Sequence, residues 1–580
     1  MIKKLAGAVR EYKKPAILSP IFITGEVILD CILPLITAGL INNIRTGCDM
    51  SLITRDGLLL VLFALLSLLC GSLAAIYSAT ASVGFAGNLR HDLFEKVQSF
   101  SFENIDKFST PSLVSRLTTD VSNVQMAFMM IIRIAIRSPL MLIFSVCSAI
   151  IVGKRLAWIF VGIIPVLFGG LFIISKLAMP IFQSVFKRYD DMNASIQENV
   201  KAMRVVKSFV REDYEIRKFE GTSDSIRGDF TKAESILAFM NPLMQLCIYC
   251  STILISFFAA KWIVQSNATY FDIGSLTAML TYSMQVLMSL MMLSMIMVML
   301  TMSQASAKRI VEVLDEESTV KNPENPVMEV KDGSITFDNV SFKYSQAAEK
   351  MALSNIDFKI VSGQTVGIIG GTGTGKSSLI QLISRIYDVT EGSVQVGGVD
   401  VRDYDLDVLR KQVAVVLQKN VLFSGTIRDN LLWGNPDADD EELIRVCKLA
   451  QADEFIQSFP DKYDTVIEQG GNNVSGGQKQ RLCIARALLR KPKILILDDS
   501  TSAVDTKTDA LIRQAFKYEI PDTTKIIIAQ RISSVQDSDL ILVMENGRID
   551  GMGTHEELLE TNDIYREVYF SQIKGGDFDE

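Results

Sequence analysis

Long apolar runs dominate the first half of the chain, whereas the second half alternates shorter apolar and polar stretches. A helix needs about 20 apolar residues to cross the ~30 Å hydrocarbon core of a bilayer. Several of the apolar runs also contain polar residues, which favours a bundle around a cavity over a set of separate anchors. We therefore expect a six-helix α transmembrane domain. Its predicted spans are 16–41, 57–80, 130–153, 156–175, 239–264 and 274–302.

The charges of the loops predict how these spans are oriented. The loop at 178–235 carries ten Lys and Arg residues, whereas the short connections at 154–155 and 265–272 carry two and none. Cytoplasmic loops are enriched in Lys and Arg, so the long loops are expected on the cytoplasmic side. We thus expect a multi-pass protein of the cell membrane with both termini in the cytoplasm.

The long loops are also predicted to be helical. No proline occurs between Pro34 and Pro111, or between Pro180 and Pro242. At 1.5 Å per residue, a helix from 57 to about 105 would be roughly 70 Å long, which exceeds the thickness of a bilayer. The helices should therefore extend far into the cytoplasm, with turns at Pro111 and in the segment 210–219.

Ionisable residues and methionines stand out within the spans. Glu26 and Asp30 lie one helical turn apart in the first span, and Arg133 and Arg137 have the same spacing in the third. Charges inside a membrane are costly unless paired, so we expect an acid to pair with an arginine. A methionine-rich sixth span is either a surface that adapts to different ligands or plain packing. Its methionines are Met279, Met284, Met288, Met291, Met292, Met295, Met297, Met299 and Met302.

Composition narrows the class of protein further. The net charge of −8 over 580 residues is small and dispersed, so no nucleic-acid partner is expected. The apolar runs end after Arg309, and the segment Lys321–Pro326 has two prolines among polar residues, as is typical of a domain linker. We assign 1–315 to the transmembrane domain, 316–330 to a linker, and 331–580 to an α/β domain.

The segment Gly370–Ser377 reads Gly-Gly-Thr-Gly-Thr-Gly-Lys-Ser, which is the pattern of a phosphate-binding P-loop. It follows an apolar strand at 365–369 and precedes a helical pattern at 379–386, which is the context that the motif requires. Glycines let backbone N–H groups surround phosphates at a helix N-terminus, where the dipole favours anions. The predicted nucleotide contacts here are Gly371, Thr372, Gly373, Thr374, Gly375, Lys376, Ser377 and Ser378.

Two side chains are candidates for binding Mg²⁺ beside this loop. The hydroxyl of the P-loop serine, here Ser377, normally binds the ion, while the lysine, here Lys376, contacts the β- and γ-phosphates. A second apolar strand at 494–497 ends in Asp498, and a carboxylate at a strand end is the expected second ligand. ATP and Mg²⁺ are therefore the predicted cofactors.

A third motif, Ser475-Gly-Gly-Gln478, lies between these two strands. With it the second half of the chain resembles the ATP-binding cassette family. The resemblance implies that Ser475, Gly476, Gly477 and Gln478 contact the γ-phosphate of ATP held by an opposite cassette. The order of six helices followed by a cassette resembles the exporter branch of that family.

Further positions match the family pattern in order along the chain. The resemblance implies that Tyr344 stacks on adenine, and that Gln418 is the Q-loop residue, which joins the Mg²⁺ ligands and the catalytic group. The segment Ser502–Asp505 matches the D-loop, so Asp505 is placed in the catalytic group as well.

Two positions depart from the family pattern. The residue after the Mg²⁺-binding aspartate is normally Glu, the general base, but here it is Asp499. Shortening the side chain by one methylene moves the carboxylate by about 1.5 Å, and a misplacement of ~1 Å can cost about 10²-fold in rate. The switch residue is normally His, but here it is Gln530, which can hydrogen-bond but cannot become cationic.

Both departures beside an intact signature resemble the degenerate-site subunit of bacterial heterodimeric multidrug exporters. The resemblance implies an ATP-hydrolysing exporter half for small hydrophobic or amphipathic compounds, active mainly with a second, non-identical chain. Its own site would bind ATP but hydrolyse it poorly, while its signature completes the competent site of the partner. The alternatives are a lipid or peptide exporter half, or a regulatory nucleotide-binding subunit without transport work of its own.

Overall fold

The computed structural model describes residues 1–265, 271–345, 348–499 and 504–576. The chain forms two compact units. The helical unit comprises Met1–Gln98 and Thr110–Glu316, and the α/β unit comprises Ser99–Ser109 and Glu317–Glu580. The short helix α4 (Phe102–Phe108) therefore packs within the α/β unit, although it lies in the first half of the sequence.

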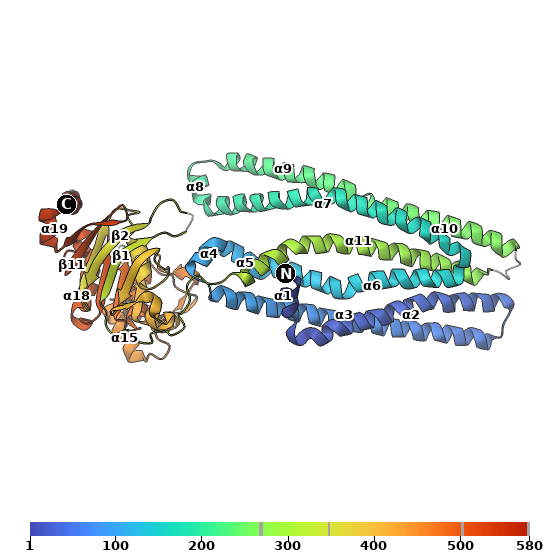
Figure 1. Ribbon diagram of the computed structural model, residues 1–580, viewed down its shortest axis with the longest axis horizontal. Helices are drawn as coiled ribbons and strands as arrows, with labels where there is room; N and C mark the ends of the chain where they lie inside the picture. Colours follow the sequence, from blue (N-terminus) through green and yellow to red (C-terminus); the bar gives the residue numbers. More distant parts are fainter. Residues whose placement is uncertain (266–270, 346–347, 500–503, 577–580) are drawn as a thin grey trace. The chain divides into compact units, whose positions relative to one another are not determined.

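Long helices that run side by side make up the helical unit (Figure 1). The helix α3 has 49 residues. At 1.5 Å per residue it is about 70 Å long, so the prediction of helices longer than a bilayer is thick is confirmed. The helices are α1 (Ile2–Gly7), α2 (Lys13–Thr46), α3 (Met50–Gln98), α5 (Thr110–Ser115), α6 (Val121–Gly153), α7 (Trp158–Lys201), α8 (Met203–Ser208), α9 (Glu212–Leu237), α10 (Met240–Gln265) and α11 (Ile273–Asp315).

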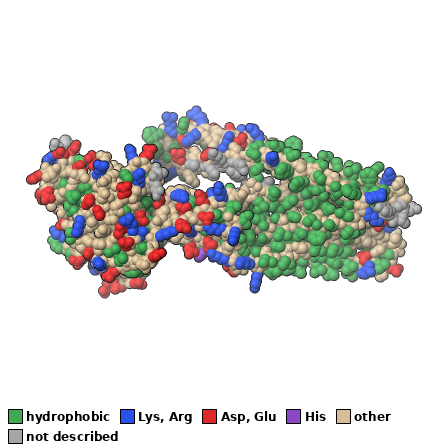
Figure 2. Space-filling model, in the orientation of Figure 1, with side chains coloured by type: hydrophobic (Ala, Val, Ile, Leu, Met, Phe, Trp, Pro, Cys, Tyr) green, Lys and Arg blue, Asp and Glu red, His purple; other side chains and the backbone are tan. Residues whose placement is uncertain are grey.

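Five stretches of the described residues are long and apolar enough to cross a membrane, one fewer than the sequence predicted. The stretch Thr110–Phe182 is 73 residues long, and the 3₁₀ turn Lys154–Ala157 interrupts it between α6 and α7. Figure 2 shows hydrophobic side chains gathered in a broad band over the helical unit. The five stretches are Arg10–Thr46, Met50–Gln98, Thr110–Phe182, Glu212–Gln265 and Ile273–Asp315.

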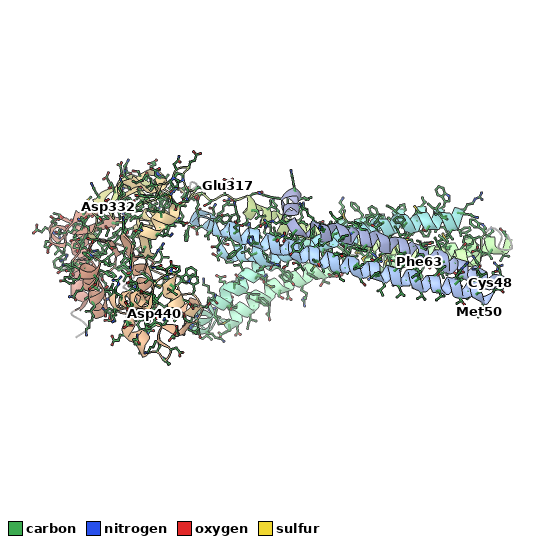
Figure 3. The ribbon with its side chains drawn as sticks, turned by 90° about the horizontal axis from the view of Figure 1, so that it is seen from below. Cys48, Met50, Phe63, Glu317, Asp332 and Asp440 are labelled. Carbon is green, nitrogen blue, oxygen red and sulfur yellow. The ribbon has the colours of Figure 1, made fainter. Side chains whose placement is uncertain are left out.

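Residues with left-handed backbone mark several turns between these helices. Gly47, with φ +71°, ends α2, and Cys48 and Met50 beside it are labelled in Figure 3, with Phe63 further along α3. The turn predicted at Pro111 lies just before it, between α3, which ends at Gln98, and α5, which begins at Thr110, with the short helix α4 in between. The second predicted turn is confirmed at Val210, with φ +53°, between α8 and α9.

The predicted ion pair between the first and third spans is confirmed. Arg137 on α6 lies 3.0 Å from Glu26 and 3.1 Å from Asp30, both on α2. Ser67 on α3 donates a hydrogen bond of 2.7 Å to Asp30. Arg133 is exposed, and no ion pair to it is found among the described residues. One arginine thus joins two carboxylates on the neighbouring helix.

A six-stranded sheet forms the centre of the α/β unit, in the order β12-β11-β3-β10-β9-β6. All neighbouring pairs in it are parallel except β11 and β12. Along β9, Ile494 and Ile496 join one hydrophobic cluster, whereas Leu495 and Leu497 join another. The sheet is therefore buried on both faces, as expected for parallel strands.

The remaining strands form an antiparallel sheet, β2-β1-β4-β5, and a small pair, β7-β8. The strands are β1 (Ile335–Phe342), β2 (Leu353–Ile360), β3 (Thr365–Gly370), β4 (Glu391–Val396), β5 (Val399–Asp400), β6 (Val413–Val416), β7 (Gly425–Thr426), β8 (Val466–Ile467), β9 (Ile494–Asp498), β10 (Thr524–Ile528), β11 (Leu540–Glu545) and β12 (Arg548–Gly553). The helices are α4, α12 (Lys376–Ile383), α13 (Leu406–Gln412), α14 (Ile427–Leu432), α15 (Asp440–Leu449), α16 (Asp453–Ser458), α17 (Gly476–Leu488), α18 (Thr506–Glu519), α19 (His555–Thr561) and α20 (Asp563–Gly576).

Candidate functional site

The carboxyl ends of four neighbouring parallel strands bring most of the predicted site residues together. The P-loop follows β3, and Gln530 follows β10. Asp498 ends β9, and Gln418 lies just beyond β6. In the sheet, Ile528 pairs with both Ile368 and Asp498, so these strand ends lie side by side. Ligand sites in open α/β sheets lie at this edge.

Backbone geometry explains the glycines of the P-loop. Gly373 has φ +81° and Gly375 has φ +96°, conformations that other residues adopt only with strain. A Cβ atom at Gly375 would lie 2.8 Å from Leu353 Cδ2 and 2.9 Å from the carbonyl oxygen of Ala352, whereas one at Gly373 would meet no atom within 4 Å. The loop then enters α12 at Lys376, which places a helix N-terminus at the phosphate position.

The ammonium group of Lys376 lies within the loop. It donates hydrogen bonds of 2.7 Å and 2.6 Å to the carbonyl oxygens of Gly370 and Gly371. Burial lowers the pKa of Lys376, and the nearby carboxylates of Asp498 and Asp499 oppose that shift. A cation held at a helix N-terminus beside backbone N–H groups suits a polyphosphate.

The oxygen atoms around Asp498 fit a magnesium ion. Ser377 Oγ lies 3.4 Å from Asp498 Oδ1. Burial raises the pKa of Asp498, and the hydrogen bond from Ser377 partly offsets this shift. No cluster of three or more His, Cys, Asp or Glu side chains suited to a metal occurs in the described parts of the chain. A hydroxyl and one carboxylate match the way proteins hold Mg²⁺, which keeps waters and substrate phosphates as its other ligands.

The two residues that depart from the family pattern are in direct contact. Gln530 Nε2 donates a hydrogen bond of 2.8 Å to Asp499 Oδ2. Gln418 Nε2 lies 3.3 Å from the same oxygen. The sequence placed these three residues in one catalytic group, and the structure brings them together at one carboxylate.

Tyr344 presents a partly exposed ring beside the P-loop helix. Its hydroxyl lies 2.8 Å from Ser378 Oγ and donates a hydrogen bond of 3.1 Å to Gln381 on the same helix. The residue is 43% exposed, which leaves area for a base to stack. The ring also contacts the rings of Phe342 and Tyr387, with centroids 4.8 Å and 5.2 Å away.

The signature segment begins a separate helix, α17. Ser475 caps this helix in a capping box, because its hydroxyl accepts from the backbone of Gln478 while the side chain of Gln478 accepts from the backbone of Ser475. Gly476 and Gly477 form the first turn. The Ser and Gln of this pattern cap the helix, and the two glycines leave its N-terminus free of side chains.

The D-loop lies only partly in the described region. Ser502 and its neighbour Ala503 lie outside the described residues. Asp505 caps α18 by accepting a hydrogen bond of 2.9 Å from the backbone of Thr508. That bond lowers the pKa of Asp505.

Sequence reasoning missed Tyr387 and its contact with α4. The Tyr387 hydroxyl donates a hydrogen bond of 2.8 Å to Asp106, and its ring lies 6.5 Å from that of Phe102. Burial raises the pKa of Tyr387, and the acidic partner adds to the shift. In the sequence, Tyr387 stands out only as an aromatic residue shortly after the P-loop helix. That position does not indicate a contact with Asp106, which lies 281 positions away.

Comparisons with known proteins agree with this arrangement. Residues 16–318 match the family described as ABC transporter transmembrane region, and residues 353–502 match ABC transporter. The chain is 34% identical over 572 residues to "Uncharacterized ABC transporter ATP-binding protein YfiB" of Bacillus subtilis, covering 99% of both chains. It is 32% identical over 577 residues to an ABC transporter ATP-binding protein of Mycobacterium tuberculosis strain H37Rv, covering 99% of this chain and 98% of that protein.

The fold also matches a solved structure described as a bacterial Atm1-family ABC exporter with ATP bound. The TM-score is 0.82 at 24% identity, covering 97% of this chain and 98% of that one. The similarity therefore extends over both compact units. The chain belongs to the ABC transporter family and joins a membrane region and an ATP-binding cassette in one polypeptide.

Proposed function

We propose that this chain is one half of an ATP-driven exporter for small hydrophobic or amphipathic compounds, and that it works with a second, non-identical half. The observation that carries the proposal is the contact of Asp499 with Gln530 in place of the usual glutamate and histidine. A shortened carboxylate beside a neutral amide is a weaker base arrangement than the usual pair. The intact signature needs a phosphate held by another cassette. We therefore propose that a second half supplies that cassette.

The site is proposed to bind ATP with Mg²⁺ and to hydrolyse it slowly. Lys376 and the P-loop N–H groups would hold the phosphates, Ser377 and Asp498 would hold the ion, and Tyr344 would stack on the base. The bound Mg²⁺ would neutralise charge that develops on the transferred phosphoryl group. Asp499 would orient the attacking water, and Gln418, just beyond β6, would contact the same site.

Six membrane spans are proposed, with both termini in the cytoplasm. The 73-residue stretch Thr110–Phe182 is much longer than the ~20 residues that one crossing requires. The turn at Lys154–Ala157 divides it into two helices, each long enough to cross. The basic loop at 178–235 supports a cytoplasmic position for the extensions.

A surface on α11 supports the proposed class of substrate. Met284, Met288, Met292 and Met295 are all exposed and recur every three or four residues, so they share one helix face. Flexible thioether side chains adapt to ligands of different shape. At the end of this face, Asp30 and Gln285 line a cavity of about 290 Å³.

The test is to purify the tagged full chain from its native membranes and to measure ATP hydrolysis by the isolated chain and by the copurified complex. We expect a second ABC half-transporter with Glu and His at the two altered positions. The isolated chain should hydrolyse ATP at least about tenfold more slowly than the complex, since one misplaced catalytic group costs that much or more. Equal rates would reject the proposed division into unlike halves.

A further inference from the structure

Two amide side chains converge on one carboxylate oxygen at the end of β9. Gln530 Nε2 donates to Asp499 Oδ2 at 2.8 Å, and Gln418 Nε2 approaches the same oxygen at 3.3 Å. The three residues come from the ends of three neighbouring strands, β10, β9 and β6. A carboxylate that accepts from donors on both sides has a fixed orientation. The two departures from the family pattern are therefore one structural feature.

The backbone at Asp499 suits an aspartate. Its φ is +46°, in the left-handed region, and its N–H donates a hydrogen bond of 3.0 Å to the carbonyl oxygen of Ile528. Aspartate adopts this conformation more readily than most residues other than glycine. The short side chain keeps the carboxylate close to the strand end, where the longer side chain of Gln530 reaches it.

The C-terminal helix α20 fixes the segment that carries Gln530. The side chain of Gln572 donates a hydrogen bond of 2.8 Å to the carbonyl oxygen of Gln530. It also accepts one of 2.9 Å from the backbone N–H of Ile532. One glutamine thus holds the backbone on both sides of Arg531, so the Gln530 amide reaches Asp499 from an anchored position.

We propose that Gln530 is a positioning residue for Asp499, and that the two form a matched pair that sets the slow hydrolysis at this site. The inference rests on the proposed ATP hydrolysis but not on which chain is the partner. A glutamate at 499 would move its carboxylate by about 1.5 Å from the place where the Gln530 amide now contacts it, a displacement large enough to remove the benefit of the longer acid. A histidine at 530 would replace the amide donor that holds the short carboxylate.

The test is a double-mutant cycle on the full chain in its complex. The variants are Asp499→Ala, Gln530→Ala and the double change, with Gln457→Ala as the matched control. Gln457 donates a hydrogen bond of 3.2 Å to Asp453 on α16, so the control removes a Gln–Asp contact outside the site. The measured quantity is the initial rate of orthovanadate-dependent trapping of photoreactive 8-azido-ATP, counted on the gel band of this chain alone.

Asp499→Ala and Gln530→Ala should each lower the trapping rate about tenfold or more without changing the affinity for nucleotide. The Gln457→Ala control should trap at the unmodified rate. The double change should lower it no further than the stronger single change, because a shared contact can be lost only once. A double loss equal to the product of the two single losses would overturn the proposal. Single changes without effect would overturn it as well.

A second cycle replaces the pair instead of deleting it. Asp499→Glu alone should raise the trapping rate by less than about threefold and Gln530→His alone should not raise it, while both together should raise it at least about tenfold. Full recovery by Asp499→Glu alone would overturn the matched pair.

Gln572→Ala should lower the trapping rate about two- to fivefold in the unmodified chain and have no effect in the Gln530→Ala variant. An equal loss in both backgrounds would show that Gln572 acts elsewhere. Because the trapping is counted on this chain, these outcomes are separate from failure of the unlike-halves proposal, which is read from total ATPase.

Discussion

The helical unit and the ATP-binding unit hold their charged groups in different ways. In the helical unit, Arg137 bonds to Glu26 and Asp30, so the chain itself compensates the charges within the membrane. In the ATP-binding unit, Lys376 donates to backbone carbonyls, and burial lowers its pKa. Burial also raises the pKa of Asp498 nearby. Shifted pKa values at a strand edge are typical of a site that acts on a ligand. The first cluster therefore stabilises the fold, and the second is arranged for chemistry.

The largest effect should come from Arg137→Leu, which breaks the compensated cluster. It leaves two carboxylates without their arginine, and the expected loss of stability is about 2–3 kcal/mol, because the arginine is partly exposed. Thermal unfolding of the protein in lipid nanodiscs measures it. The control adds Glu26→Gln and Asp30→Asn to the same variant and should recover most of the loss. If the triple variant were as unstable as Arg137→Leu, charge compensation would not be the role of the cluster.

A smaller effect is expected from Gly375→Ala, which tests whether close packing requires a glycine at this position of the P-loop. The new Cβ would lie 2.8 Å from Leu353 Cδ2, in a residue with φ +96°. The loop must shift, so we expect nucleotide affinity to fall about tenfold or more. Gly373→Ala is the matched control, because it adds the same methyl group at φ +81° with no atom within 4 Å. Titration with a fluorescent nucleotide should show a much larger loss of affinity for Gly375→Ala than for Gly373→Ala. A larger loss for Gly373→Ala would contradict the steric explanation.

The smallest effect is expected from Tyr387→Phe, which removes one hydroxyl from the α/β unit. Its hydrogen bond of 2.8 Å to Asp106 ties α4 to this unit. Loss of such a bond costs about 1 kcal/mol, so hydrogen exchange in Phe102–Phe108 should accelerate about fivefold. Tyr518→Phe, at an exposed position, is the control. Unchanged exchange in both variants would mean that the ring contact alone holds α4.

Much of the ATP-binding site could be predicted from the sequence, because short motifs there have strict backbone requirements. The glycines of Gly370–Ser377 are required by left-handed backbone and close packing, and Asp498 by its place at a strand end. These requirements are local, so a single sequence contains them. The hydrogen bond between Gln530 and Asp499 joins residues 31 positions apart, and no local pattern indicates it.

The helical unit could be predicted less fully. Length and hydropathy identified the long helices, and two acids (Glu26, Asp30) and two arginines (Arg133, Arg137) within the spans indicated an ion pair. Which arginine pairs depends on how α6 rotates against α2, and that is decided by packing along both helices. The same limit applies to α4, which was assigned to the membrane half by its place in the sequence. Its contacts with the α/β unit, such as that of Asp106 with Tyr387, are long-range.

In the proposed pair of unlike halves, this chain supplies its signature to a competent site and keeps an impaired site for itself. The direct measurement is the steady-state ATPase rate of the complex with Gly477→Asp and with Lys376→Ala, side by side. Gly477 lies in the first turn of α17, and an acidic side chain there would repel the phosphate that the proposal assigns to the partner's site. We predict that Gly477→Asp nearly abolishes hydrolysis, whereas Lys376→Ala leaves it partly active. If Lys376→Ala were the more damaging change, this chain's own site would be the main site of hydrolysis, and the proposal of unlike halves would be wrong.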